Sequence, residues 1–266
     1  MRFCSIASGS SGNCIYVGSD VTHLLVDVGI SGKKTEEGLN SLGIRPDELD
    51  GILVTHEHAD HINGLGVISR KYGIPIYATR GTIEAIRNTS NIGNIDDSLF
   101  NEVRSDTKFV LKDITVNPMR ISHDAAEPVG YRFSYGRKRL AICTDLGVYN
   151  DYTVECLRGM DALLIEANHD VNMLTCGPYP YPLKQRILGD RGHLSNEASG
   201  RLLCEILHDK LQTIVLGHLS KENNLPELAY EAVRLEISMG DNPYKGNDFP
   251  IYVAKRSEPT RVVEIA

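Results

Sequence analysis

Four residues that commonly bind metal ions lie within one short stretch, from Thr55 to His61. His56, His58 and His61 carry imidazoles, and Asp60 carries a carboxylate. Groups of this kind are costly to remove from water unless they bind something. Imidazole and carboxylate ligands suit divalent cations such as Zn, Mn or Fe, and the sequence leaves these three metals open. We therefore interpret the stretch as a metal site; the alternative, a polar surface loop, matches this spacing poorly.

The residues on either side of this stretch predict a strand before it and a helix after it. Residues 51–54 are an apolar run typical of a buried strand, and residues 62–72 have the periodicity of a helix. His56 and His58 are two positions apart, too close to share one helix face, so they are expected in the turn itself. The last two ligands stand at the helix start and can face a second point in space. Two sets of ligands indicate two cations.

The pattern His-x-His-x-Asp-His resembles the signature of the metallo-β-lactamase superfamily at every defined position. This resemblance implies an α/β (α+β) fold, a four-layer αββα sandwich with metals held at one edge of its two sheets. It also implies three further ligands downstream: a His, an Asp and a last His. Residues of these types follow apolar, strand-like runs in the expected order, at His123, Asp145 and His218.

The same resemblance implies a dinuclear centre. The implied ligand sets are His56, His58 and His123 for one metal, Asp60, His61 and His218 for the other, and Asp145 as the bridge. A hydroxide shared by the two metals is then the nucleophile, and the positive centre suits a phosphodiester. One class of lactamases has Cys where Asp145 stands, and flavodiiron relatives have Glu where His58 stands. Lactamase and oxidoreductase chemistry are therefore disfavoured.

Two residues outside the metal set bear on the reaction. Glu166 at a strand end and His193 before a capped helix resemble a Glu/His pair in the tRNA-3′-processing nucleases of the superfamily. There the His lies near the scissile phosphate and the Glu orients it. A carboxylate bonded to an imidazole raises the proton affinity of the ring, which makes a phosphate ligand or a general acid. Asp60, Glu166 and His193 are the candidate catalytic residues; alternatively, the pair are ordinary loop residues. His169 is left open as a ligand support or a substrate contact.

A glycine-rich turn, residues 8–13, separates two strand-like runs near the start of the chain. Its glycines permit positive φ, and its N–H and hydroxyl groups are suited to holding a phosphate. We hypothesise that the 5′-phosphate of DNA binds between this turn and the segment after His218, which would set a 5′→3′ polarity. The proposed donors are Ser10, Ser11, Asn13, Ser220, Lys221 and Asn223. The alternative is that the two segments are tight turns whose polar groups form hydrogen bonds only with the backbone.

The rest of the chain predicts the elements that position these residues. Further strands are expected at 2–7, 14–17, 23–28, 74–78, within 109–142 as the second sheet, and at 162–165, 211–216 and within 249–265. Further helices are expected at 31–42, from Thr79, at 195–208 and at 225–238. Residues 90–106 and 171–192 are expected to be loops. With no repeat and no clear linker, we expect one domain over residues 1–266.

The composition excludes several classes of protein. A charged fraction of 24% and a hydrophobic fraction of 41% are ordinary for a globular chain. No apolar run approaches the ~20 residues of a membrane span, so we expect no membrane partner and no signal peptide. Six cysteines without a C-x-x-C pair indicate reduced thiols and a cytoplasmic protein. A formal net charge of −7 excludes a generally basic surface for nucleic acid. The oligomeric state is not predicted.

Over its full length the chain resembles the YycJ/WalJ branch of the superfamily. The stretches that carry this resemblance are residues 8–13, 55–61, 190–196 and 217–224. The branch is similar to 5′→3′ DNA exonucleases, which implies DNA as the substrate. The chain has no room for an inserted β-CASP domain and no long flexible arm for tRNA, which disfavours RNA processing. Two alternatives stay open: a hydrolase of thioesters or cyclic phosphodiesters on the same metals, and a non-catalytic regulator that keeps the fold.

Overall fold

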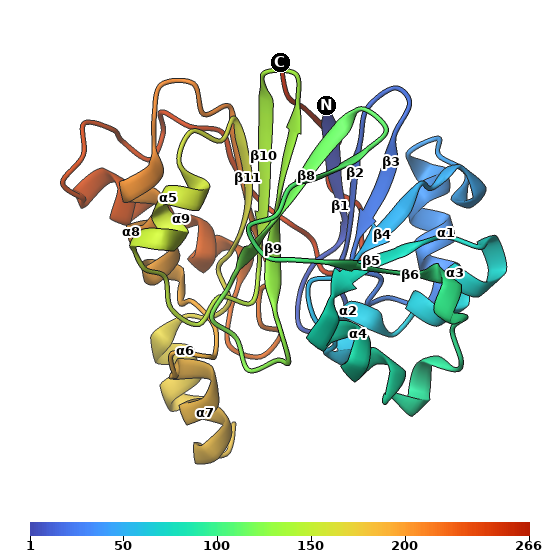
Figure 1. Cartoon of the computed structure of the whole chain (residues 1–266). Coiled ribbons are helices and arrows are strands. Elements are labelled where there is room, and N and C mark those ends of the chain that lie inside the picture. Colours follow the sequence, from blue (N-terminus) through green and yellow to red (C-terminus); the bar gives the residue numbers. More distant parts are fainter.

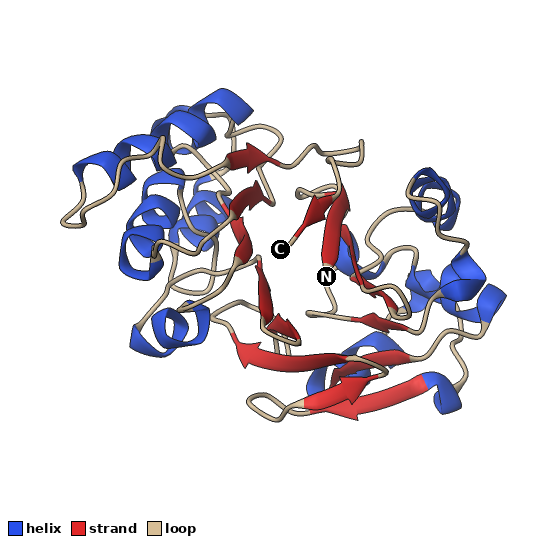
Figure 2. Cartoon of the chain, turned by 90° about the horizontal axis from the view of Figure 1, so that it is seen from above, coloured by secondary structure: helices blue, strands red, loops and turns tan.

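The computed structural model describes residues 1–266 and contains two seven-stranded sheets with helices on their outer faces (Figure 1). Viewed from above in Figure 2, the two sheets lie next to each other and the helices form a layer on either side. The four-layer αββα fold that the sequence predicted is confirmed. None of the helices combines the length and the apolar character that crossing a bilayer requires.

The first sheet has the strand order β14-β1-β2-β3-β4-β5-β6. Its strands are β1 (Arg2–Ala7), β2 (Cys14–Gly18), β3 (His23–Val26), β4 (Gly51–Leu53), β5 (Ile76–Thr79), β6 (Phe100–Val103) and β14 (Val263–Glu264). Strands β3 to β6 run parallel to one another. The helices of this half are α1 (Gly32–Ser41), α2 (Ala59–Ile62), α3 (Leu65–Tyr72) and α4 (Arg80–Arg87), with short 3₁₀ turns at Pro46–Glu48, Ser90–Ile92 and Asp97–Leu99.

The second sheet has the order β13-β12-β11-β10-β9-β8-β7. Its strands are β7 (Phe109–Leu111), β8 (Ile114–Arg120), β9 (Val129–Tyr135), β10 (Lys138–Cys143), β11 (Ala162–Glu166), β12 (Thr213–Gly217) and β13 (Ile251–Val253). Strands β10 to β13 are parallel. The helices of this half are α5 (Asp151–Leu157), α6 (Val171–Cys176), α7 (Tyr181–Leu188), α8 (Asn196–Ile206) and α9 (Pro226–Met239).

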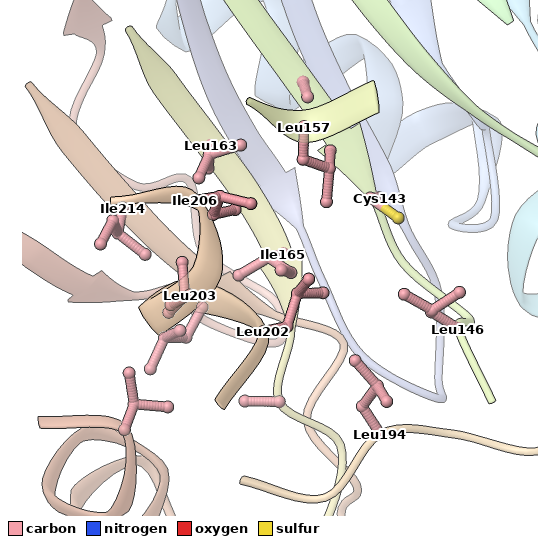
Figure 3. Packing of buried hydrophobic residues seen from close by; sticks show 14 of the residues in the cluster. Cys143, Leu146, Leu157, Leu163, Ile165, Leu194, Leu202, Leu203, Ile206 and Ile214 are labelled. Carbon is pink, nitrogen blue, oxygen red and sulfur yellow. The ribbon is translucent and has the colours of Figure 1, made fainter. Parts of the chain in front are cut away.

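Three hydrophobic clusters fill the three spaces between the four layers. The cluster between the sheets includes Leu24 and Phe133, and Tyr131 in the same cluster donates a hydrogen bond of 2.8 Å across to the Val54 carbonyl. A second cluster joins the first sheet to its helices. The third joins β10, β11 and β12 to the helices that cover this sheet, and it includes Leu163, Leu203 and Ile206 (Figure 3). Burial of these faces fixes the sheets relative to each other.

The parallel strands of both sheets place their carboxyl ends at the same edge of the sandwich. In Figure 1 this edge carries α2, α6 and α7 and lies opposite to the two chain termini. The loops after β4, β10 and β12 carry the predicted ligands, and β11 ends at Glu166. In sheets of parallel strands, sites form at carboxyl ends because loops from neighbouring strands meet there.

Three expectations about the elements were wrong. The stretch 171–192 contains α6 and α7 instead of a loop; α7 buries none of its residues, so it shows no apolar periodicity from which to predict it. The stretch 90–106 contains β6. The helix expected at 62–72 is two helices with a break at Gly64, where a Cβ would lie only 2.1 Å from the Ile30 carbonyl oxygen. Glycine is required there because backbone packs against backbone.

Candidate metal centre

The first candidate ligands lie in the turn between β4 and α2. The N–H and the hydroxyl of Thr55 both donate to Asp27, at 2.8 Å each, which fixes the chain just before His56. α2 begins at Ala59 with His58 as its N-cap residue, but the His58 ring makes no capping hydrogen bond. This ring is therefore free to face neighbouring ligands.

Three imidazoles converge beside this turn. His58 Nδ1 lies 3.1 Å from His56 Nε2 and 3.2 Å from His123 Nε2. His123 comes from the loop after β8, so the group joins the two sheets. A proton on one of these ring nitrogens cannot satisfy all three, because they face the same point. A cation at that point can accept a lone pair from each nitrogen.

Asp60, His61 and His218 form a second group, and Asp145 lies between the two groups. Asp60 Oδ2 is 3.5 Å from His61 Nε2 and 3.2 Å from His218 Nε2. Asp145 Oδ2 is 3.3 Å from His61 Nε2, and its Oδ1 is 3.8 Å from His123 Nε2. One carboxylate therefore lies close to candidate ligands of both groups.

The polar atoms of this cluster fit divalent cations. Asp145 Oδ2 is buried and accepts no hydrogen bond, which is costly for a carboxylate oxygen. Burial raises the pKa of Asp145, but His218 and His61 outweigh burial and hold that pKa far below its ordinary value. The group stays an anion that can coordinate a cation. The seven predicted ligands all belong to groups that could hold a metal ion, and one of these groups also contains Glu166 and His193; the seven are His56, His58, Asp60, His61, His123, Asp145 and His218.

Asp27 supports the cluster, although it is not among the residues predicted from the sequence. Its Oδ2 accepts a hydrogen bond of 2.7 Å from His61 Nδ1, and its side chain is buried at the end of β3. A ligating histidine commonly donates its second nitrogen to a carboxylate, which orients the ring. A signal was present in the sequence: residues 27–29 read Asp-Val-Gly after a strand, much as residues 145–147 read Asp-Leu-Gly.

Three residues of the site adopt left-handed backbone conformations. The φ angles are 60° for Asp27, 58° for Asp145 and 54° for His218. Such conformations are unfavourable for residues other than glycine and persist where the surrounding structure enforces them. Each of the three directly follows or lies close to the carboxyl end of a parallel strand. The chain therefore turns sharply where these loops begin.

Glu166, the last residue of β11, connects the metal cluster to His193. Its Oε1 accepts hydrogen bonds from His193 Nδ1 at 2.8 Å and from His218 Nδ1 at 2.9 Å. Its Oε2 accepts from the N–H groups of Leu146 and Leu194. Burial raises the pKa of Glu166, but His193 and His218 lower it to about 2. One buried carboxylate therefore orients both a candidate ligand and a candidate acid.

His193 is more exposed than the buried candidate ligand His218, although less exposed than His58, whose side chain is 29% exposed. The His193 side chain is 19% exposed, compared with 1% for His218. Burial lowers the pKa of His193, but the Glu166 carboxylate outweighs burial and raises it above the ordinary value. With Nδ1 bonded to Glu166, Nε2 is the nitrogen that remains for a substrate.

A family model described as a beta-lactamase superfamily domain matches residues 22–214. The chain belongs to this superfamily. The match spans every candidate ligand except His218, which lies just beyond it. The resemblance seen in the His-x-His-x-Asp-His stretch is confirmed.

Two relatives within the superfamily match nearly the whole chain. The exodeoxyribonuclease WalJ of Streptococcus pneumoniae is 40% identical over 264 residues, which cover 99% of this chain and 98% of the relative. The exodeoxyribonuclease YycJ of Bacillus anthracis is 44% identical over 263 residues, which cover 98% of each chain. The resemblance to the YycJ/WalJ branch is confirmed as well.

The crystal structure of Zn²⁺-bound PqqB from Methylobacterium extorquens shares the superfamily fold. The two chains superpose with a TM-score of 0.72 over 98% of this chain and 99% of that one, at 15% identity. Family membership, the two relatives and the ligand cluster together identify the protein as a metal-dependent hydrolase.

The glycine-rich turn lies against the loops that carry the candidate metal ligands. Asn13 Oδ1 accepts from the Gly9 N–H at 2.9 Å, and Asn13 Nδ2 donates to the Asp60 carbonyl at 3.3 Å. Ser8 Oγ accepts from the His218 N–H at 2.8 Å. The turn therefore contacts the loops that carry the first and the last ligands.

The six predicted phosphate donors fall into two sets. The exposed set is Ser10, Ser11 and Lys221, and the buried set is Asn13, Ser220 and Asn223. Within the buried set, Ser220 Oγ accepts a hydrogen bond of 3.2 Å from the Asn223 N–H. Phosphate binding by these residues stays a prediction.

Other residues near the ligands carried no motif from which to predict them. Asp124 lies 3.6 Å from His123 Nε2 and pairs with Arg186, and Arg191 donates to the His123 carbonyl at 2.9 Å. His169, which the sequence left open, is buried with no partner for either ring nitrogen. Burial lowers the pKa of His169 to about 4, so its ring is neutral.

Proposed function

We propose that this chain is a dinuclear metal-dependent phosphodiesterase that digests DNA from the 5′ end. The observation that supports this most is the hydrogen-bonded Glu166–His193 pair beside the ligand cluster. Both full-length relatives are named exodeoxyribonucleases, which supports DNA as the substrate class. Zn, Mn and Fe all suit the ligand types present.

Hydrolysis of a phosphodiester needs a nucleophilic water, stabilisation of negative charge and a proton for the leaving oxygen. Divalent cations, when bound, lower the pKa of water and stabilise charge on the phosphorus oxygens. Asp60, whose side chain is 25% exposed, can orient the attacking water. His193 donates a proton from Nε2 to the leaving 3′-oxygen while Glu166 holds Nδ1. The P–O3′ bond breaks, and the phosphate stays on the remaining strand.

Attack from the 5′ end requires a site that holds the strand terminus. The residues we assign to this site are Ser10, Ser11, Asn13, Ser220, Lys221 and Asn223. The exposed hydroxyls of the glycine-rich turn support the assignment, because the turn contacts both ligand loops. Since each cleavage leaves a new 5′-phosphate, the same site would serve every cycle of a 5′→3′ exonuclease.

The test uses one DNA strand labelled at either end, with or without a 5′-phosphate, and metal-loaded protein. We expect mononucleotides from the 5′ end, released faster when the phosphate is present. Digestion from the 3′ end, or indifference to the phosphate, would contradict the polarity. A parallel panel of RNA, an aryl phosphodiester and a thioester separates a nuclease from a small-molecule hydrolase. Faster turnover of the thioester than of DNA would contradict a phosphodiesterase.

A further inference from the structure

Arg256, in the segment after β13, holds a guanidinium group without a counter-ion. Its Nη2 donates to the Ser220 carbonyl at 3.3 Å, while its Nη1 is buried and has no hydrogen-bond partner. The neighbouring acid Glu258 pairs with Lys255 instead, at 2.7 Å. Arginine cannot lose its proton to avoid this cost, so a buried, unpaired guanidinium nitrogen indicates a place for an anion.

The guanidinium lies against the glycine-rich turn. Gly12 N–H donates to the Gly9 carbonyl at 2.9 Å, which places Ser10 and Ser11 at the centre of a tight turn. A Cβ on Gly9 would lie 3.0 Å from the Leu219 carbonyl oxygen, and the φ of Gly9 is +146°. Only glycine allows this approach of the turn. The same Cβ position is 3.7 Å from the Arg256 Nη1 atom.

The turn also offers donors that the chain itself does not use. Ser10 and Ser11 are exposed, and their N–H groups make no backbone hydrogen bond. A cavity of about 320 Å³ opens beside Ser11, and Arg256 and Lys34 line it together with two further serines and several apolar side chains. Its acidic wall residue, Glu37, lies 3.8 Å from Lys33. The size is at the lower end of the range for pockets that bind small molecules, about 300–1,000 Å³.

Arg256 and the glycine-rich turn both form hydrogen bonds with the loops that carry the candidate metal ligands. Arg256 bonds the backbone at Ser220, two residues after His218. Asn13, at the end of the turn, donates its N–H to the Asp60 carbonyl at 2.8 Å. An anion held here would therefore lie next to the ligand loops.

We propose that Arg256 binds the terminal 5′-phosphate of the DNA strand, together with the Ser10–Ser11 turn and Lys34 across the cavity. The inference rests on the proposed function and adds two residues that no motif indicated. A terminal phosphate is a dianion, and a guanidinium group can donate two parallel hydrogen bonds to it. The terminal phosphate of the substrate is then the counter-ion that Arg256 lacks.

The experiment measures binding by metal-loaded protein of one strand with a 5′-phosphate or a 5′-hydroxyl. Phosphorothioate groups at the first linkages protect the strand from digestion. We expect wild type to prefer the 5′-phosphate by about 10- to 100-fold, the range for hydrogen bonds to charged groups. Arg256→Gln should lose most of this preference, and Arg256→Lys should keep part of it. Lys255→Gln is the matched control, since it removes an exposed charge one residue away and should leave the ratio unchanged.

Equal loss of binding to both strands in Arg256→Gln and Lys255→Gln would overturn the proposal, because it would show a general charge effect. If Arg256→Gln loses metal or secondary structure, Lys34→Gln decides; its preference should fall about 2- to 5-fold, and an unchanged ratio overturns the proposal. A preference that depends on Arg256 in a protein that does not digest DNA supports this site and refutes the exonuclease. Digestion from the 5′ end without dependence on Arg256 refutes this site alone.

Discussion

The ligand cluster and the glycine-rich turn are neighbours at the same depth, yet their polar groups are satisfied in different ways. Asn13 in the turn is 0% exposed and Asp145 in the cluster is 2% exposed. The Asn13 amide bonds the backbone of Gly9 and Asp60 and lies 3.1 Å from His61 Nε2, whereas Asp145 Oδ2 accepts no hydrogen bond. The Asn13 amide therefore holds the turn against the ligand loops, whereas the unpartnered Asp145 oxygen indicates where a cation binds.

Replacing Asp145, the carboxylate with an unsatisfied oxygen, should have the largest effect of the variants considered. Asp145→Asn keeps the size of the side chain and tolerates the same left-handed backbone, but it removes the charge. We expect metal content to fall from two equivalents towards one or none, with a loss of activity greater than that of any other variant below. Elemental analysis of metal-saturated protein measures this. Wild-type protein that never exceeds one equivalent would contradict the dinuclear centre.

Removing His193 separates proton transfer from metal binding. His193→Ala should keep its metals, because the ring is not among the seven assigned ligands. The rate of DNA hydrolysis should fall by roughly 10²–10⁴-fold, the usual contribution of a general acid. Metal analysis and single-turnover digestion check both halves of the prediction. Wild-type turnover by this variant would show that the Glu166–His193 pair has no catalytic role.

Glu166 links the two regions of the site, so its replacement should affect both. Glu166→Gln weakens the orientation of His218 and of His193 at once. We expect metal affinity to fall by about 10–100-fold, as for other carboxylates that orient ligating histidines. Excess metal should recover part of the activity of Glu166→Gln and none of that of His193→Ala. Equal behaviour of the two variants in a metal titration would refute this difference.

Asp27→Asn should have a smaller effect of the same kind, because it supports one ligand only. Its amide oxygen can still accept from Thr55, but the charge beside His61 is lost. Metal affinity should fall by about 10-fold, measured by competition with a chelator. Asp113→Asn is the control, since Asp113 also accepts from hydroxyl groups but contacts Ser19 and Thr22 away from the metals. Equal effects of the two variants would show that Asp27 acts on stability alone.

The smallest effects are expected for two serines of the glycine-rich turn. Ser8 Oγ is buried and bonded to the His218 N–H, whereas Ser11 is exposed. Ser8→Ala should reduce the free energy of unfolding by about 1 kcal/mol, the net value of one hydrogen bond. Ser11→Ala should leave stability unchanged and reduce the preference for a 5′-phosphate a few-fold. A loss of stability in Ser11→Ala and a loss of 5′-phosphate preference in Ser8→Ala would contradict this assignment of the two serines.

The site residues that could be predicted from the sequence lie within a run of ligand types or directly after an apolar strand. His56 to His61 are contiguous, and Asp145 and His218 each follow an apolar strand whose end is visible in the sequence. Arg256 follows only a short strand and has no neighbouring ligand types, so its contact with Ser220 appears only after folding. α7 escaped prediction because it packs against no core. One domain over residues 1–266 stays a prediction.

The parallel arrangement of β10, β11 and β12 has a consequence for how this centre can change. Each strand supplies one residue at or just beyond its end: Asp145, Glu166 and His218. Neighbouring strands lie about 4.8 Å apart, an interval set by main-chain hydrogen bonds. Main-chain hydrogen bonds therefore hold the three strand ends in place whatever side chains they carry. Evolution can exchange the side chain at one strand end without moving the other two.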